Sequence, residues 1–235
     1  MRISVALAYY NGGQYIKEQL DSIRKQLGEN DEVIISVDAA DDGSLEYLNS
    51  VAREDRRLHI LEGPGLGVVK NFEYAIMHCT KDVIFLADQD DIWTDDKVRT
   101  VMHYFKKTDV KAILHNAELV DENGDSLGKN MFVLRKSNKG ILHNLIRNSY
   151  VGCCMAFRRE LLPLICPIPD EMYMHDYWIG TIAELNGGVG LIRRPLLKYR
   201  RHGANVTQME HGRLKEMVKK RINMLKCLHR LKTKA

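Results

Sequence analysis

The amino-acid sequence predicts an α/β fold with a mixed, mostly parallel central sheet flanked by helices. Short apolar runs alternate with segments of helical periodicity through the first half of the chain, and polar residues follow where each run ends. These runs are continuously apolar, which is typical of strands buried on both faces. Ligands of such sheets bind outside the carboxyl ends of the strands, so the residues after each run are the candidates for function.

The first half of the chain is expected to alternate between buried strands and helices. Gly12 and Gly13 separate the first strand from a helix whose apolar residues, from Tyr15 to Leu27, recur at helical spacing. Ser44 can cap the second helix, and a Gly-Pro-Gly turn at 63–65 precedes the third. The expected strands are 3–9, 33–37, 58–61 and 83–87.

The second half is less regular. Gly187 and Gly188 are expected to end a helix over 176–185. No linker is visible before about residue 208, so we expect one domain over 1–207 and a separate tail over 208–235. The expected strands of this half are 111–114, 151–157, 189–192 and 196–199.

The composition excludes several classes of protein. With 45% hydrophobic and 28% charged residues over 235 positions, the chain is not disordered, collagen-like or a coiled coil. Its longest apolar run, Val5 to Tyr10, is too short to span a membrane. The five cysteines are odd in number and lack metal or redox spacing, so we expect reduced thiols in a cytoplasmic protein. Cys153 and Cys154 lie in an apolar run and are expected to be unreactive.

The tail is strongly basic. Residues 210–235 contain nine Lys or Arg and two Glu, whereas the net charge of the whole chain is +4. Its apolar residues recur at intervals of three and four, which predicts a basic amphipathic helix. The apolar stripe can pack on the domain or on a second copy of the chain, or it can lie on the inner leaflet of the plasma membrane. No aromatic residues alternate with the cations, so we exclude a nucleic-acid partner. The stripe consists of Leu214, Met217, Val218, Ile222, Leu225, Leu228 and Leu231.

Carboxylates follow two of the expected strands. Asp88-Gln89-Asp90-Asp91 comes directly after the strand at 83–87, and this density of oxygen ligands suits Mg²⁺ or Mn²⁺ bound together with phosphates. The alternative is a polar loop in which one Asp caps the next helix. Asp38 ends the strand at 33–37, where it can contact a bound nucleotide or simply make a turn. The absence of Gly-Lys-Ser/Thr and of G-x-G-x-x-G excludes a Walker-type phosphate loop and argues against a nicotinamide dehydrogenase.

An ordered set of motifs in this chain resembles family 2 glycosyltransferases with the GT-A fold. The resemblance covers about residues 1–207, and its second half is closest to the bacterial rhamnosyltransferase-like branch used in surface polysaccharide assembly. It implies a nucleotide-binding half over 1–93 and an acceptor-side half over 94–207. The matching segments are 3–12, 19–23, 67–72, 86–93, 152–153, 175–178 and 195–205.

The resemblance also implies a role for individual residues. Asp176 matches the catalytic base of inverting members, and Asp88, Asp90 and His202 match the residues around the metal. The implied acceptor contacts are Gly152, His175 and Trp178. The implied nucleotide-sugar contacts are Tyr10, Asn11, Asp38, Lys70, Asn71, Asp88 and Arg200.

One segment departs from the family pattern. In the ungapped match, Val37 stands where the family has the first of two acids, and Ala39 and Ala40 stand where it has Gly-Ser after Asp38. The family motif Asp-Asp-Gly-Ser does occur at 41–44, but aligning it with the family requires a gap and a longer second strand. We prefer Asp38 as the base-contacting acid, and the change leaves the identity of the nucleotide open.

The implied activity is inverting, Mn²⁺- or Mg²⁺-dependent glycosyl transfer. The donor would be a UDP- or dTDP-sugar, and the acceptor a hydroxyl of a glycan or lipid-linked molecule, in a hexosyl- or rhamnosyltransferase of bacterial surface polysaccharide or glycoconjugate synthesis. We expect a cytoplasmic protein, with peripheral contact to the inner face of the plasma membrane or homo-oligomerisation through residues 210–235. The alternative is a catalytically silent GT-A domain that serves as partner or scaffold of another transferase.

Overall fold

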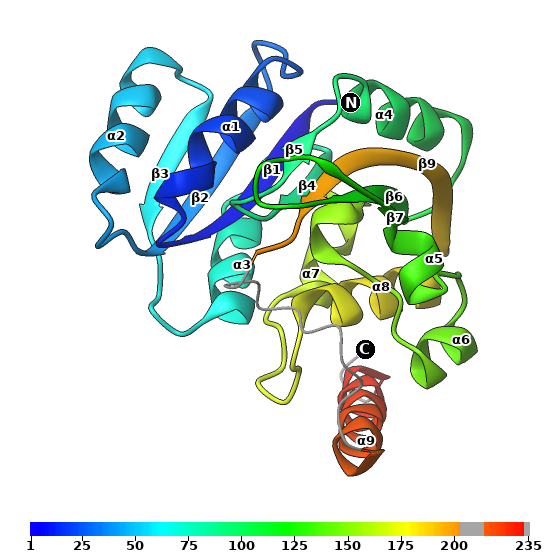
Figure 1. Ribbon diagram of the computed structural model, residues 1–235. Coiled ribbons are helices and arrows are strands. Elements are labelled where there is room, and N and C mark those ends of the chain that lie inside the picture. Colours follow the sequence, from blue (N-terminus) through cyan, green and yellow to red (C-terminus); the bar gives the residue numbers. More distant parts are fainter. Residues whose placement is uncertain (203–213, 233–235) are drawn as a thin grey trace.

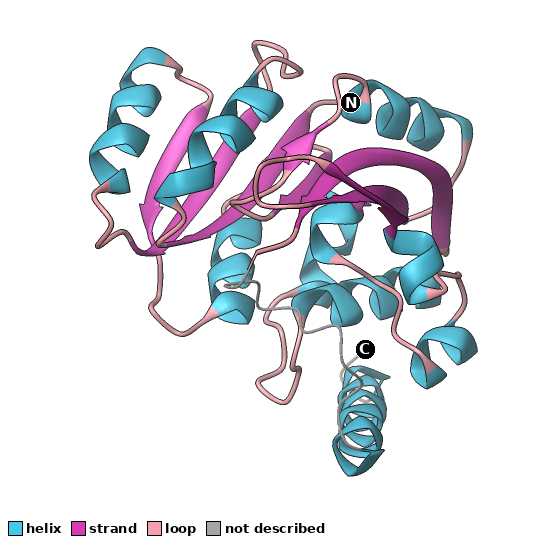
Figure 2. Ribbon diagram, in the orientation of Figure 1, coloured by secondary structure: helices cyan, strands magenta, loops and turns pink. Residues whose placement is uncertain are grey.

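A computed structural model describes residues 1–202 and 214–232 of the chain, with side chains described up to 202 and from 218 to 230. The described part contains one nine-stranded sheet flanked by helices (Figures 1 and 2). Its strands follow the order β3-β2-β1-β4-β8-β6-β9-β5, with β7 paired to β6. This is the mixed α/β architecture that the sequence predicts.

The first half is regular because its strands are apolar on both faces. All strand pairs in the β3-β2-β1-β4 part are parallel. Helices α1 and α2 cover one side of this part, and α3 lies on the other (Figure 1). Ser44 is the first residue of its helix rather than the cap, since Gly43, with a φ of 79°, precedes it and the Ser44 hydroxyl bonds to Asp42. The elements are β1 (Ile3–Tyr10), α1 (Gly13–Arg24), β2 (Glu32–Ala39), α2 (Ser44–Glu54), β3 (Leu58–Glu62), α3 (Val68–Met77) and β4 (Val83–Ala87).

The second half departs from the expected mostly parallel sheet. Strand β8 lies antiparallel between β4 and β6, and the β5–β9 and β6–β7 pairs are antiparallel too, whereas β6 and β9 are parallel. The two short strands expected at 189–192 and 196–199 form one strand, and the strand expected at 151–157 begins with a 3-10 turn, η1. The elements are β5 (Ile92–Trp93), α4 (Lys97–Lys107), β6 (Ala112–Val120), β7 (Ser126–Asn130), α5 (Met131–Arg135), α6 (Ile141–Ile146), η1 (Gly152–Cys154), β8 (Met155–Arg158), η2 (Arg159–Leu161), α7 (Leu162–Ile165), α8 (His175–Leu185) and β9 (Val189–Arg200).

The predicted tail helix is present as α9 (Leu214–Lys232). Met224 and Cys227 of this helix are buried in the core, and Leu228 of the predicted stripe is partly buried against it. Val218, Ile222 and Leu225 of the predicted stripe are exposed instead. The side chains of Leu214, Met217 and Leu231 lie outside the described residues. Among the described residues, no helix has the length and apolar character needed to cross a membrane.

Candidate active site

The acidic loop after β4 is fixed to the first strand and the first helix. The buried Gln19 of α1 donates from Nε2 to the Asp88 carbonyl oxygen at 2.6 Å. The Gln89 side chain accepts from the Tyr10 N–H at 2.6 Å and donates to the Tyr10 carbonyl at 2.8 Å. Gln89 also lies over Gly12, where an added Cβ would sit 2.4 Å from its Cδ. The loop is therefore held at the carboxyl ends of β1 and β4.

The carboxylates of this loop repel one another in a partly dry environment. Burial, followed by the charge of Asp90, raises the pKa of Asp88 to about 7. Asp91 is 1% exposed, and burial and the charges of Asp90 and Asp88 raise its pKa well above the usual value. Its Oδ1 accepts from the Arg200 N–H at 3.1 Å, but its buried Oδ2 has no hydrogen-bond partner within the described residues. Such a cluster is stabilised by a cation.

Two of the three predicted metal ligands, Asp90 and His202, are in contact. His202 Nε2 is 2.8 Å from Asp90 Oδ2, and the imidazole stacks on Tyr15 with ring centroids 4.8 Å apart. One ligand atom each from Asp88, Asp91 and Cys153 also lie within 4.8 Å of one another. Carboxylate oxygens and a nearby imidazole fit a divalent cation bound together with phosphates.

Arg200 supports the loop from the protein side. It is 2% exposed, and its guanidinium donates to the Asp90 carbonyl at 2.9 Å, the Glu122 carbonyl at 2.6 Å and the Glu18 carboxylate at 2.5 Å. The charge also lies 4.9 Å from the Tyr15 ring centroid. The expected contact with a nucleotide-sugar diphosphate is therefore not supported, because these guanidinium donors already have protein acceptors.

The strand-end acid on the nucleotide side is Asp38. Its Oδ1 accepts from the Gly65 N–H at 3.0 Å. An added Cβ at Gly63 would lie 2.4 Å from that same oxygen and 3.0 Å from Asn71 Oδ1. Asn71 is 2% exposed and donates to the Tyr9 carbonyl at 3.1 Å, while its Oδ1 has no hydrogen-bond partner among the residues described. Asp38 and Asn71 thus flank one glycine in the loop after β3.

The competing segment at 41–44 has a local structural role. Asn11, with a φ of 44°, accepts from the Asp41 N–H through Oδ1 at 2.8 Å. Asp42 accepts from the Gly13 N–H at 2.7 Å and from the Ser44 hydroxyl at 2.5 Å. These bonds form the turn after β2 and join it to the start of α1. Because β2 ends at Ala39, the geometry favours Asp38 as the strand-end acid.

Lys70 connects α3 to the segment that precedes α8. Its Nζ bonds to Glu73 at 2.9 Å, to Asp170 at 2.8 Å and to the Ile168 carbonyl at 3.0 Å. Because its ammonium has these partners, the structure gives Lys70 a positioning role rather than the expected nucleotide-sugar contact.

Asp176 is a buried carboxylate on a different element from the acidic loop. It is 6% exposed and lies one residue after the start of α8, whose N-cap is Met174. Its Oδ1 accepts from the Tyr177 N–H at 2.6 Å. Burial raises the pKa of Asp176 to about 6, and the backbone N–H groups of Tyr177 and Gly152 oppose this shift. The charge of Asp176 contributes to the raised pKa of Asp88, so the two acidic sites are electrostatically close.

Two of the expected acceptor contacts lie inside the protein. His175 is 2% exposed and stacks on Phe72 at a centroid distance of 3.9 Å, and burial lowers its pKa to about 3, so the ring is neutral. An added Cβ at Gly152 would lie 2.7 Å from His175 Nε2, which explains the glycine there. Trp178 is 1% exposed and donates to the Ile165 carbonyl at 2.9 Å. Contrary to the expectation, Trp178 is a core residue with no face open to an acceptor.

Three positioning residues were not identified from the sequence. Gln19 and Gln89 lie inside segments that match the family, but no role was assigned to them there. Lys97 is fully buried, donates to the Cys153 carbonyl at 2.8 Å and lies 4.0 Å from the Trp93 ring centroid. Burial lowers the pKa of Lys97 to about 8. Lys97 follows an acidic segment at an ordinary helix start, so nothing in the sequence distinguishes it from an exposed lysine.

Relatives of this chain are named as glycosyltransferases. An uncharacterized glycosyltransferase of Nostoc sp. is 25% identical over 216 residues, 87% of this chain and 66% of the relative. TuaG of Bacillus subtilis, whose name assigns it to teichuronic acid biosynthesis, is 23% identical over 154 residues, 64% of this chain and 59% of TuaG. This chain thus spans just under two thirds of the Nostoc relative.

Solved structures share the fold. S. aureus TarS 1-349 in complex with UDP-GlcNAc matches with a TM-score of 0.70 at 18% identity, over 91% of this chain and 62% of that chain. The mannosyltransferase PcManGT from Pyrobaculum calidifontis, in complex with GDP-Man and Mn²⁺, matches with a TM-score of 0.60 at 22% identity, over 82% of this chain and 54% of that one. The model of the family described as Glycosyl transferase family 2 matches residues 4–164. The chain therefore belongs to glycosyl transferase family 2 and has the GT-A fold.

Proposed function

We propose that the protein is an inverting, divalent-metal-dependent glycosyltransferase. It moves a sugar from a nucleoside diphosphate to a hydroxyl of a glycan or lipid-linked acceptor. The observation that carries this proposal is the pairing of a crowded acidic loop after β4 with a separate buried carboxylate, Asp176, in the first turn of α8. The relatives add support, because TuaG is named for a polysaccharide pathway and TarS was solved with a UDP-sugar.

The acidic loop fits a divalent cation. Asp88, Asp90 and His202 would hold Mn²⁺ or Mg²⁺, and Asp91, whose Oδ2 has no hydrogen-bond partner among the described residues, lies near Asp88. Bound there, the cation would stabilise the charge that develops on the leaving diphosphate. The Mn²⁺ complex of the structurally similar PcManGT is consistent with this assignment.

The chain's own residues would carry the proton transfer and orient the donor. The acceptor oxygen forms a bond to the anomeric carbon while the bond from that carbon to the diphosphate oxygen breaks. Asp176 accepts the hydroxyl proton, and attack from the face opposite the leaving group inverts the configuration. A pKa of about 6 leaves Asp176 mostly ionised at neutral pH, yet basic enough to accept a proton. Asp38 and Asn71 would contact the nucleotide from the loop after β3.

We further propose a donor, a transferred group, a branch of the family and a location in the cell. The donor is a UDP- or dTDP-sugar, the transferred group is a hexosyl or rhamnosyl unit, and the chain belongs to the rhamnosyltransferase-like branch. The protein works in the cytoplasm, at the inner face of the plasma membrane. The alternative is a silent GT-A domain that assists another transferase, which Ala39 and Ala40 beside Asp38 favour.

A thermal-shift panel of nucleotide sugars with Mn²⁺ or Mg²⁺ tests the proposal. A donor at one hundred times its Kd stabilises the fold by about 2.7 kcal/mol, which raises the Tm of a chain of this size by roughly 5–10 °C. We expect one donor to stand out and its metal-dependent turnover to release the nucleoside diphosphate. A donor-specific shift without turnover would identify the silent domain instead, and no shift with any donor would contradict both functions.

A further inference from the structure

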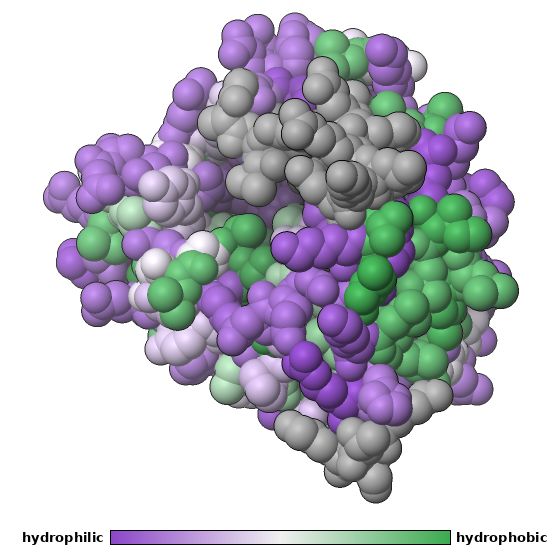
Figure 3. All heavy atoms as spheres, turned by 90° about the horizontal axis from the view of Figure 1, so that it is seen from below, coloured by the Kyte–Doolittle hydropathy of each residue, from purple (hydrophilic) through white to green (hydrophobic). Residues whose placement is uncertain are grey.

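An exposed apolar surface spans three helices at one end of the molecule. Its members are aliphatic side chains of α5, α6 and α9, each between 45% and 78% exposed. Figure 3 shows this green surface beside α9, on the side where α6 lies in Figure 1. We call it the α6–α9 face and define it as residues 131–147 and 218–230. Its exposed apolar residues are Val133, Leu142, Ile146, Val218, Ile222 and Leu225.

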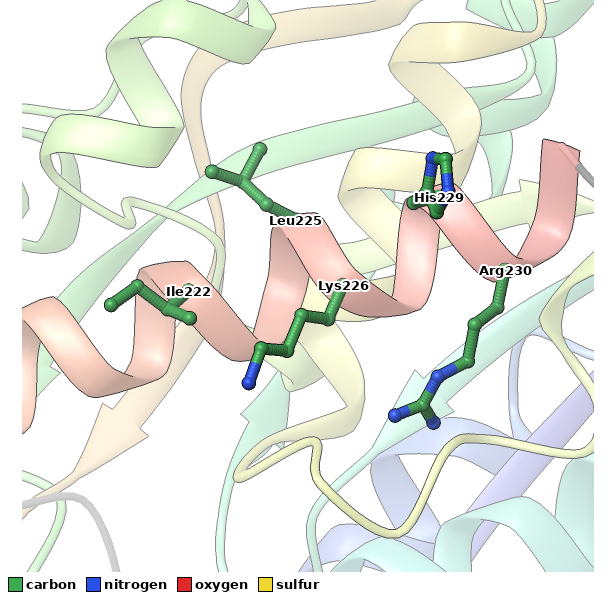
Figure 4. A pocket seen from close by; sticks show the side chains of 5 residues that line it. All are labelled: Ile222, Leu225, Lys226, His229 and Arg230. Atoms are coloured by element: carbon green, nitrogen blue, oxygen red, sulfur yellow. The ribbon is translucent and has the colours of Figure 1, made fainter.

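Direct contacts join the tail helix to α6. Arg221 donates from Nε to the Leu145 carbonyl at 2.9 Å and from Nη2 to the Ile146 carbonyl at 2.8 Å. These bonds place the exposed side of α9 next to the exposed end of α6. In Figure 4, Ile222 and Leu225 project from α9 into a shallow open groove that is lined by this one helix. The apolar side chains of the two helices therefore belong to one surface.

The two segments that carry the α6–α9 face are also basic. Its two segments contain nine Lys or Arg and no Asp or Glu. The acids packed against it come from other elements and already have partners. Glu171 pairs with Arg230 at 2.6 Å, and Glu184 accepts from the Gly140 N–H at 2.5 Å. The face thus combines exposed aliphatic groups with a concentrated positive charge.

We propose that the α6–α9 face docks on an anionic lipid surface. Aliphatic side chains can enter the boundary between headgroups and acyl chains, while Lys and Arg bind anionic headgroups. A second copy of the chain fits less well, because a two-fold interface would bring the same basic patch together from both subunits. The exposed apolar residues are aliphatic rather than aromatic, so binding is shallow and depends on charge and ionic strength.

The docking face is connected to the candidate base. Lys220 lies 4.2 Å from the Tyr173 ring centroid, and Arg230 bonds to Glu171. Both partners belong to the short segment that leads into Asp176 at the start of α8. Docking would therefore bring the acceptor side of the site close to the bilayer. This step rests on the proposed function. Docking narrows the proposed acceptor, a glycan or lipid-linked molecule, to a lipid-linked hydroxyl compound.

Vesicle flotation of the full chain tests the docking face. Vesicles of phosphatidylcholine alone are compared with vesicles that also contain phosphatidylglycerol, at low and high salt. We expect the protein to float with the anionic vesicles alone and to be released by salt. Ile222→Ser/Leu225→Ser should reduce flotation through lost insertion, and Lys219→Glu/Lys226→Glu should abolish it through lost charge.

Matched variants make the test specific. Leu45→Ser removes an exposed apolar side chain from α2, and Lys106→Glu/Lys107→Glu makes the same charge change on α4, so both should float normally. Donor binding by thermal shift should be unchanged in every variant, which separates this test from the proposed function. The inference is overturned if the wild type does not float, if the α4 variant loses flotation equally, or if the α9 variants alter oligomeric state instead.

Discussion

The acidic loop after β4 and the carboxylate of Asp176 are both largely buried, but the groups that surround their charges differ. In the loop, burial and mutual repulsion raise the pKa values of Asp88 and Asp91 together, and one oxygen of Asp91 has no partner among the described residues. Asp176 lies on α8, where burial raises its pKa, while the Tyr177 N–H, the charge of Arg135 and the Gly152 N–H oppose the rise. The loop is thus suited to binding a cation, whereas Asp176 is suited to accepting and releasing a proton.

The strongest test of this comparison is Asp90→Asn. Loss of this proposed metal ligand should remove several kcal/mol of charge stabilisation in the transition state, so transfer should fall about 10³-fold or more. Excess EDTA should reproduce the loss in the wild type, and isothermal titration should show weakened Mn²⁺ binding in the variant. Asp95→Asn is the control, since this neighbouring acid is exposed and pairs with Lys25. Full activity of Asp90→Asn, or in EDTA, would remove the metal from the mechanism.

Asp176→Asn should affect proton transfer and leave the donor site intact. We expect transfer to fall about 10²- to 10⁴-fold, the usual contribution of a general base, with an unchanged donor Kd. In the wild type the carboxylate must be ionised to accept a proton, so the rate should rise as pH increases through about 6 and level off above it. That rise should be missing from the residual activity of Asp176→Asn. A normal transfer rate in this variant would rule out Asp176 as the base.

Gly152→Ala gives the smallest expected effect and tests the support behind Asp176. The new Cβ would lie 2.7 Å from His175 Nε2, and overpacking of this kind costs about 1–3 kcal/mol in unfolding free energy. Urea denaturation measures the loss. Gly28→Ala is the matched control, because its Cβ would meet Asp31 at an ordinary 3.4 Å. Equal stabilities of the two variants would show that the Gly152–His175 contact is not tightly packed.

The first half of the fold was accessible from the sequence because its strands are local, continuous apolar runs. The run at 83–87 coincides with β4, and the acids that follow it lie where parallel-sheet topology requires. The insertion of β8 between β4 and β6 depends on pairing between residues far apart in the chain, which no local pattern encodes.

The candidate site was less predictable, because the type of a residue does not show whether its side chain is buried in the protein or exposed to a ligand. The grouping of Asp90 with His202 followed from the family motifs, but the burial of Trp178 and Arg200 did not. Both are amphipathic groups that serve equally well as ligand contacts or as buried hydrogen-bond donors. In the tail, periodicity indicated the helix but not which of its apolar residues would be covered, since that depends on the surface it meets.

The bonds of Arg200 have a consequence for the newly synthesised chain. This residue ends β9, and it joins Glu18, the acidic loop and Glu122, which enter the growing chain much earlier. Because domains fold as synthesis proceeds from the N-terminus, the strands β1 to β4 can assemble while the acidic loop still lacks its support. Competence to bind the proposed nucleotide-sugar donor would therefore arise late, after β9 has emerged from the ribosome and paired with β6.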